Sequence, residues 1–314
     1  MCYPYATCRP TINGRCSGIR RSYLGAGQYG HQKTMKDDII LSLYIEKYQH
    51  NADCILLVGS RAEGISTRTS DIDLIIVTKS PEKYGVESNN YLLGKFNDIK
   101  FEILIITKND LKKTIKESFV KKDFYTLQKI LFGRVIFGNL NFDIERHKKE
   151  FRVRYYIKNT DQALKMYYAL EGIKCDCHLQ QYAFSLKKYL EKIAEIYLFQ
   201  RGDNYIKPRW LISRLIRSEG EHSPLLRAFF KAIHHSTHRK KDIDELECQV
   251  MNITGIMLYK SIYQKEVTFD ENKNSSSPRF YAMERESQII LFCARGSFLM
   301  PKENGKDIIE KMIF

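Results

Sequence analysis

The chain has 314 residues, of which 43% are hydrophobic and 28% charged, so it is long enough to form two domains with apolar cores. This composition excludes a disordered chain, and no apolar run reaches the length of a membrane span. The formal net charge of +14 favours anionic partners such as nucleotide triphosphates or nucleic acid. No apolar signal segment begins the sequence, so we expect a cytoplasmic protein with no membrane partner.

The first residues are strongly basic. Residues 1–33 contain no acidic residue, and we expect them to be a flexible tail. The cations of this tail are Arg9, Arg15, Arg20, Arg21 and Lys33. Residues 34–37 read Thr-Met-Lys-Asp, which has the form of a capping box. We therefore predict a helix from Thr34 to about Tyr48, at the start of a first domain that spans 34–143.

A glycine–serine turn joins two apolar runs that we expect to be strands. Residues 56–58 lead into Gly59 and Ser60, and residues 74–77 form the second run. Gly59 lets the backbone approach a ligand closely, because it has no side chain. Ser60 offers an N–H and a hydroxyl to phosphate oxygens. The turn is therefore a candidate triphosphate-binding site.

Carboxylates gather next to this turn in the predicted sheet. Asp71 and Asp73 follow Ser70, and side chains at i and i+2 of a strand point to the same face. Glu102 lies in an apolar strand over 99–106, the second arm of a predicted hairpin, where an acid is costly to bury without a partner. Close carboxylates repel unless a cation lies between them, and hard oxygen ligands suit Mg²⁺. The three acids therefore predict a metal site.

These segments, from about 56 to 107, resemble the signature of the nucleotidyltransferase superfamily, which shares the DNA polymerase β-like catalytic fold. The turn at residues 61–64 is similar to the small-residue turn of the minimal and the antibiotic-modifying branches. As a whole, the chain most resembles the aminoglycoside and other antibiotic nucleotidyltransferase-like proteins. The resemblance implies an α+β fold, with a catalytic mixed sheet and helices followed by an α-helical domain. It also implies that Asp71, Asp73 and Glu102 are catalytic and bind two Mg²⁺ ions, and that Gly59, Ser60 and Ser70 contact the nucleotide. The family often has Asp where this chain has Glu102.

The rest of the chain is mostly helical in pattern. We predict helices over 109–131, a last strand of the first domain at 133–138, and a helical substrate- and nucleotide-binding domain over 144–266. Lys187 and Lys188 of that domain are candidate phosphate ligands, with a solvated helix face as the alternative. Residues 204–211 resemble the Tyr…Pro-x-(Lys/Arg)-Trp-Leu segment of aminoglycoside-nucleotidyltransferase-like proteins. Residues 267–314 are expected to be a linker and a small appendage.

The expected function is a Mg²⁺-dependent nucleotidyltransferase. The resemblance implies transfer of NMP, with ATP as the expected donor, to a hydroxyl of a small molecule such as an aminoglycoside-like antibiotic, with release of pyrophosphate and a role in resistance. The alternative is a nucleotidyltransferase that acts on RNA, at a tRNA 3′ end, or that AMPylates a protein in a toxin–antitoxin pair. A noncatalytic binding protein is disfavoured because all three carboxylates are present. The sequence leaves the acceptor open.

Overall fold

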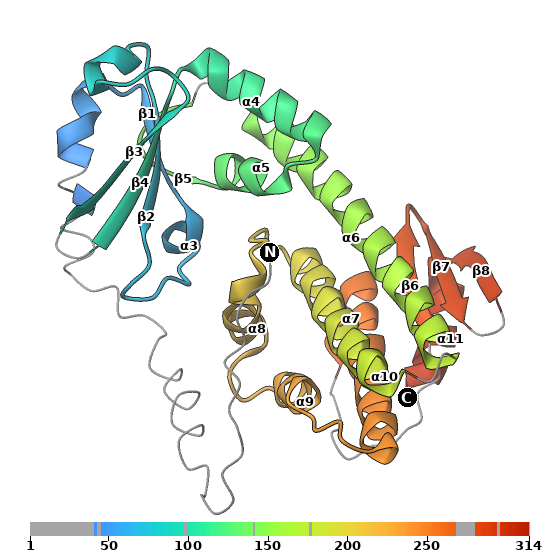
Figure 1. The fold of residues 1–314 in the computed structure, drawn as a ribbon. Helices are drawn as coiled ribbons and strands as arrows, with labels where there is room; N and C mark the ends of the chain where they lie inside the picture. Colours follow the sequence, from blue (N-terminus) through green and yellow to red (C-terminus); the bar gives the residue numbers. More distant parts are fainter. Residues whose placement is uncertain are drawn as a thin grey trace, which may run out of the picture. The chain divides into compact units, whose positions relative to one another are not determined.

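The computed structural model describes residues 41–42, 45–96, 99–140, 142–175, 178–267, 280–293 and 296–313. The chain divides into two compact units, Met1–Leu43 and Tyr44–Phe314. The predicted basic tail and the predicted helix start at Thr34 lie outside the described residues. Residues 41–42 and 45–48 are helical, as expected for the later part of that helix. The helices and strands of the second unit are labelled in Figure 1.

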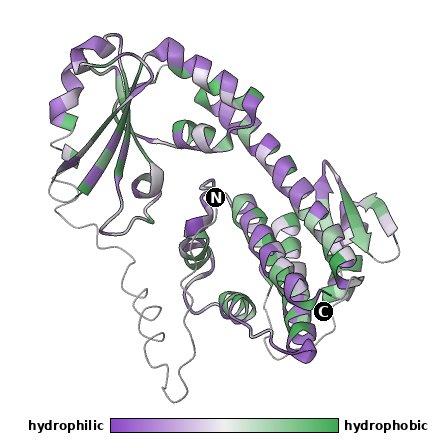
Figure 2. Ribbon diagram, in the orientation of Figure 1, coloured by the Kyte–Doolittle hydropathy of each residue, from purple (hydrophilic) through white to green (hydrophobic). Residues whose placement is uncertain are grey.

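A five-stranded sheet forms the first part of this unit, in the order β3-β4-β2-β1-β5. Its strands are β1 (Cys54–Val58), β2 (Ile72–Val77), β3 (Asn90–Phe96), β4 (Ile99–Ile106) and β5 (Arg134–Gly138). All neighbours pair antiparallel except β2 and β4, which are parallel. Hydrophobic residues line these strands (Figure 2), and every residue of β1 is buried. The predicted strands, the hairpin and the mixed α+β class are confirmed.

Two helices rather than one follow the sheet. They are α4 (Lys108–Lys121) and α5 (Phe124–Leu131), and both contribute to the apolar core on one face of the sheet. The break has a local cause, since Lys122 has a left-handed backbone with φ of 56° and ends α4. The Asp123 carboxylate then accepts a hydrogen bond from the Thr126 N–H at 3.1 Å and caps α5.

Helices dominate the rest of the unit. They are α6 (Ile144–Cys175), α7 (Leu179–Gln200), η4 (Pro208–Trp210), α8 (Leu211–Glu219), α9 (Pro224–Ile233) and α10 (Lys240–Tyr263). One face of α7 is buried at Tyr182, Leu186, Leu190 and Ile193, where it joins the main helical core. None of the described helices combines the length and the low charge needed to cross a membrane.

The C-terminal segment, which the sequence did not assign, adds a small sheet to the helical core. It comprises β6 (Phe280–Arg285), β7 (Gln288–Cys293), β8 (Gly296–Pro301) and α11 (Lys302–Ile313), with the strands antiparallel in that order. Phe280, Tyr281 and Ile309 are buried in the same cluster as α7 and α10. The Tyr281 hydroxyl donates to the Thr160 carbonyl at 2.9 Å. This segment therefore completes the helical core.

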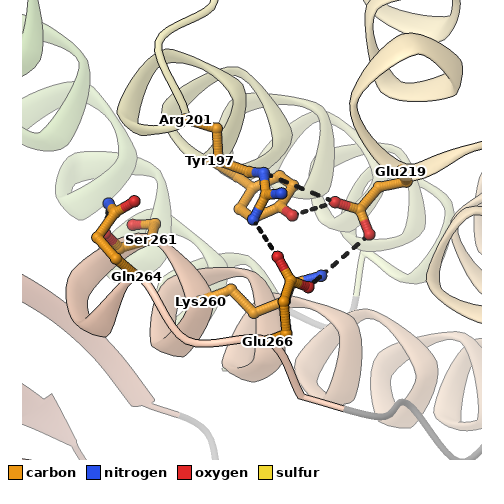
Figure 3. Close-up of polar contacts among 7 residues, drawn as sticks. All are labelled: Tyr197, Arg201, Glu219, Lys260, Ser261, Gln264 and Glu266. Atoms are coloured by element: carbon orange, nitrogen blue, oxygen red, sulfur yellow. Dashed lines mark hydrogen bonds and ion pairs between the residues drawn. The ribbon is translucent and has the colours of Figure 1, made fainter.

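A buried ion-pair network fixes the end of α8 (Figure 3). Lys260 of α10 lies 3.0 Å from Glu219 of α8 and 3.0 Å from Glu266, and its side chain is 4% exposed. The Tyr197 hydroxyl of α7 donates to Glu219, and Arg201 pairs with Glu266 at 2.8 Å. The Lys260–Glu219 pair at the centre of this network is buried, whereas Glu266 at its edge is 70% exposed.

Candidate active site

Two acids from neighbouring strands meet at one lysine. Asp73 of β2 is the register partner of Glu102 of β4, so the two carboxylates lie side by side on adjacent parallel strands. The Lys129 ammonium of α5 lies 3.2 Å from Asp73 Oδ1 and 3.3 Å from Glu102 Oε1. The Asp73 side chain is 14% exposed and that of Glu102 39% exposed, so water and ligands reach Glu102 more easily. The structure therefore brings Asp73 and Glu102 together, as the sequence predicts.

Lys129 was missed by the sequence analysis. Burial lowers the pKa of its ammonium, but the charge of Asp73, followed by Tyr125 and Glu102, outweighs burial and raises the pKa well above its usual range. Lys129 is therefore positively charged. The signal that marks it is its place in α5, between Gln128 and Ile130, which are both buried. A lysine within such a run needs an acidic partner.

The glycine–serine turn touches the same carboxylate. Gly59 begins α3 (Gly59–Ala62) with a φ of +74°, a conformation that side chains disfavour. A Cβ placed at Gly59 would collide with the carboxylate of Asp73. Ser60 is buried beside it, 4% exposed. Glycine is therefore required at this position for two reasons: the backbone has a positive φ, and the Asp73 carboxylate occupies the space that a Cβ would take.

The loop before β2 is held by Arg61. Its guanidinium donates to the Ser70 carbonyl at 2.7 and 3.2 Å and to the Asp71 carbonyl at 3.2 Å. The Ser70 hydroxyl accepts the Thr67 N–H at 2.9 Å, so it closes a turn. Asp71 is exposed just before β2. Within the described ranges no three His, Cys, Asp or Glu side chains are grouped closely enough to hold a metal, so Asp71 is not gathered with the other two acids.

The donor chemistry at Asp73 and Glu102 nevertheless fits a divalent cation. Both carboxylates supply hard oxygen donors, and a positive charge, that of Lys129, already lies between them. When no metal ion is bound, the charges of Asp73 and Glu102 repel the Asp71 carboxylate, which favours its exposure to water. Asp73 and Glu102 could therefore hold Mg²⁺, and Asp71 stays a predicted further ligand.

Ion pairs connect the loop after α3 to the helical part. The Arg217 guanidinium of α8 donates to the Glu63 carbonyl and lies 2.8 Å from Asp203 Oδ2. Arg214, which is 1% exposed, lies 3.2 Å from Asp203 Oδ1. Burial, and then the charge of Asp203, raises the pKa of Glu63, while the two arginines act in the opposite direction. Residues 203–217 thus contact the loop that begins at Gly59.

Tyrosines and a lysine of the two parts lie near Asp73. Tyr205 is fully buried, and its hydroxyl has no hydrogen-bond partner among the described residues. Burial, then Tyr125, and the charges of Asp73 and Glu63 raise the pKa of Tyr205. The Tyr125 ring lies 4.7 Å from the Lys207 ammonium and 5.4 Å from that of Lys129. The segment over 204–211 therefore supplies polar groups close to the carboxylates.

The other predicted phosphate ligands have partners inside the helical part. The Lys187 ammonium donates to the His235 carbonyl at 2.9 Å, and burial lowers its pKa. Lys188 pairs with Glu191 at 2.7 Å. Phe199, at the other end of α7, packs against the sheet, and Lys187 precedes it by twelve residues, or about 18 Å of helix. A contact of Lys187 or Lys188 with a phosphate stays a prediction.

Comparison with known proteins finds a family for the part of the chain that contains the five-stranded sheet. Residues 44–158 match the family model of the nucleotidyltransferase domain, and this range includes Gly59, Asp73, Glu102 and Lys129. A nucleotidyltransferase-like protein from Exiguobacterium sibiricum is 10% identical, with 83% of this chain and 97% of that chain covered and a TM-score of 0.35. A spectinomycin adenyltransferase from Enterococcus faecialis, solved with ATP and spectinomycin, is 12% identical, with 67% and 96% covered and a TM-score of 0.27.

These TM-scores are too low to support an argument about the site, and no curated protein matches the chain. The identification therefore rests on the family model, together with a sheet whose turn and paired acids have the places that the resemblance predicts. The chain therefore contains a nucleotidyltransferase domain over residues 44–158 and is a nucleotidyltransferase enzyme.

Proposed function

We propose that this enzyme transfers NMP, with ATP as donor, to a hydroxyl group of its acceptor and releases pyrophosphate. The observation that carries the proposal is the pair Asp73 and Glu102, joined through Lys129, with Asp73 placed directly against Gly59. A triphosphate that approaches the Gly59–Ser60 backbone would bring its α-phosphate next to both carboxylates. Binding energy from the phosphates thus positions the reacting atom at the acids.

Asp73 and Glu102 would hold Mg²⁺, with Asp71 as the predicted further ligand. When bound there, two Mg²⁺ ions would polarise the phosphoryl oxygens and lower the pKa of the acceptor hydroxyl. Lys129 would then exchange a carboxylate for a phosphate oxygen, because its ammonium is charged and lies beside the same acids. Lys207 contacts the same Tyr125 ring as Lys129 and would be a second cation for the phosphates.

The reaction itself is an in-line displacement at phosphorus. The acceptor oxygen forms a bond to the α-phosphorus, and the bond from that phosphorus to the oxygen bridging to the β-phosphate breaks, so pyrophosphate leaves with the electron pair. The proton of the acceptor hydroxyl passes to a carboxylate. Glu102 suits this role better than Asp73, since its side chain is 39% exposed against 14% and can face an incoming hydroxyl.

For the acceptor we propose a small molecule with free hydroxyl groups, such as an aminoglycoside-like antibiotic. The support is the sequence resemblance at 204–211, together with Tyr205, which lies close enough to Asp73 to feel its charge, and Lys207, which contacts the Tyr125 ring. RNA and protein acceptors are the alternatives.

The test is transfer of label from each of the four α-labelled NTPs with Mg²⁺ to a panel of aminoglycosides, lincosamides, bulk tRNA and a cell lysate. We expect labelled product from ATP with one small-molecule class, pyrophosphate in equal amount, and neither from an Asp73→Asn control. Transfer to tRNA or to a lysate protein alone would contradict the acceptor class. Equal product from wild-type and Asp73→Asn protein would contradict the mechanism.

A further inference from the structure

Three large apolar or aromatic side chains are exposed around Glu102. Leu93 of β3 is 75% exposed and Tyr91 of the same strand 50%, and Tyr125 of α5 is 37% exposed. A single exposed leucine is ordinary on a protein surface. A group of such side chains beside the carboxylate that is to take the proton of the acceptor indicates a surface that a substrate covers.

The pairing of the strands places Leu93 directly next to Glu102. Leu93 is the register partner of Glu102, and Tyr91 is that of Leu104, two residues further along β4. Directly opposite residues of an antiparallel pair share a face and have Cβ atoms about 5 Å apart. Leu104 is buried in the core, whereas Tyr91 and Leu93, on the edge strand, are exposed. The apolar face of the sheet therefore continues past Glu102 into an open strip on β3.

Tyr125 approaches the same carboxylate from α5. Its ring lies 5.4 Å from the Lys129 ammonium, which in turn lies 3.3 Å from Glu102 Oε1. Burial raises the pKa of the Tyr91 hydroxyl, and the charge of Lys129 lowers it. Glu102, Tyr125 and Asp73 raise this pKa further. The two tyrosines therefore lie within electrostatic range of each other beside the acids, one on the sheet and one on α5.

These groups have an order across the sheet. A row of register partners runs from Val58 of β1 through Asp73 and Glu102 to Leu93. Gly59, which is to meet the triphosphate, follows Val58 at one end of the row. Neighbouring strands are about 4.8 Å apart, so Leu93, at the other end, lies about 10 Å beyond Asp73. The two acids therefore lie between the glycine–serine turn and the exposed leucine.

The chemistry of the proposed reaction gives each end of this row a different role. In an in-line displacement the attacking oxygen and the leaving oxygen lie on opposite sides of the phosphorus. With pyrophosphate at the Gly59–Ser60 turn and the α-phosphorus at the acids, the attacking hydroxyl comes from the side of Leu93. The nucleoside takes neither of these two positions, because it stays attached to the phosphorus.

We propose that Tyr91, Leu93 and Tyr125 form the acceptor subsite, a platform for the apolar C–H face of a hydroxyl-bearing ring. The saturated ring of a sugar or cyclitol has C–H groups on its faces and hydroxyls at its rim, so the platform can cover one face while a rim hydroxyl meets Glu102. The Tyr91 hydroxyl can bond a second hydroxyl of the same ring. The role of this ring as acceptor rests on the proposed function, whereas its binding to the platform does not.

The first test separates the KM for the acceptor from the KM for ATP in the full chain. The variants are Leu93→Ser and Tyr91→Ala, which remove apolar surface and leave both acids in place. The matched control is Val135→Ser, because Val135 is an apolar residue of β5, the opposite edge strand, and is 46% exposed. We expect the KM for the acceptor to rise at least about tenfold in both variants, while the KM for ATP stays within about twofold. Val135→Ser should behave as wild type.

The second test needs no transfer. The full chain is labelled with 3-fluorotyrosine, and fluorine NMR follows Tyr91, whose signal is identified by its loss in Tyr91→Phe. The probes are spectinomycin, kanamycin and lincomycin, which carry hydroxyl-bearing rings and are added without NTP. A non-hydrolysable ATP analogue is added in a separate sample. We expect at least one of the ring compounds to shift the Tyr91 signal, and to do so more than the ATP analogue does.

The outcomes separate this inference from the proposed function. A KM for the acceptor that is unchanged in Leu93→Ser and Tyr91→Ala, or raised equally in Val135→Ser, would overturn the acceptor subsite and leave the transfer reaction in place. A rise in the KM for ATP alone, or a Tyr91 signal that only the ATP analogue shifts, would make the platform a nucleobase site and overturn the proposal as well. A Tyr91 signal that none of the ring compounds shifts would also overturn it. A shift with a ring compound in a chain that transfers no NMP would support the platform and contradict the proposed function alone.

Discussion

Two lysines of this protein each lie between a pair of carboxylates, yet their surroundings differ. Lys129 joins Asp73 to Glu102 at the sheet, and Lys260 joins Glu219 to Glu266 in the helical part. Lys260 and Glu219 are 4% and 6% exposed and the Tyr197 hydroxyl also donates to Glu219, while the second partner, Glu266, is 70% exposed. Lys129 is 16% exposed and Glu102 39%.

The difference indicates what each arrangement can do. A buried pair with further hydrogen bonds cannot exchange its partners without a large cost, so the network at Lys260 holds α7, α8 and α10 together. A pair that water reaches can exchange one cation for another. The Asp73–Lys129–Glu102 group is therefore suited to accept a metal ion and phosphates, while the buried Lys260–Glu219 pair is suited to structure alone.

The largest expected effect is at Asp73. Asp73→Asn keeps the shape of the side chain but removes its charge, so transfer should fall by at least about 1,000-fold, or about 4 kcal/mol. The protein should stay folded, because one carboxylate fewer reduces repulsion at this edge of the sheet. Steady-state transfer rates and thermal melting check the two halves of this prediction. A rate within about tenfold of wild type would rule out a metal-binding role for Asp73.

The next largest effect is on stability, where loss of Lys260 should cost more than loss of Lys129. Lys260→Met leaves Glu219 buried without its cation and should lower the free energy of unfolding by about 3 kcal/mol. Lys129→Met should cost only about 1 kcal/mol, since Glu102 is more exposed. Urea unfolding measures both, with Lys188→Met, an exposed partner of Glu191, as control. Equal losses of unfolding free energy in Lys129→Met and Lys260→Met would show that the two lysines do not differ in structural role.

The glycine–serine turn should affect nucleotide binding more than folding. Gly59→Val adds a side chain that meets the Asp73 carboxylate and requires a left-handed backbone, so the KM for NTP should rise by about 100-fold. Ser60→Ala, which leaves the backbone unchanged, should raise it by less than about tenfold. Isothermal titration with NTP checks both variants, and unchanged affinity in Gly59→Val would exclude the turn from the nucleotide site.

The smallest effect is expected at the N-terminus. Deletion of residues 1–33 should leave transfer to a small molecule within about twofold of wild type, because every residue placed at the carboxylates lies after 44. The truncated and full-length chains are compared at two salt concentrations. A loss of more than about tenfold, about 1.4 kcal/mol, together with strong salt dependence would favour an RNA acceptor that the tail helps to bind.

The sheet and its turn could be predicted because local sequence determines them. The spacing from Gly59 to Asp73 and the apolar strand around Glu102 fix which side chains share a face. Lys129 could not be found in this way, since its contact with Asp73 depends on how α5 packs against the sheet. The same holds for Arg217, which reaches Glu63 from 154 residues further along the chain. Short strands such as β8 could not be predicted either, because their residues do not alternate between apolar and polar.

The central claim is that Asp73 and Glu102 hold catalytic metal ions and that Lys129 occupies the position between them until the metal arrives. Its most direct test is titration with Mn²⁺, followed by electron paramagnetic resonance, in the presence of a non-hydrolysable ATP analogue. The account predicts binding of two ions to the wild-type protein, loss of at least one in both Asp73→Asn and Glu102→Gln, and tighter binding in Lys129→Met. Wild-type stoichiometry and affinity in Asp73→Asn and Glu102→Gln would contradict it.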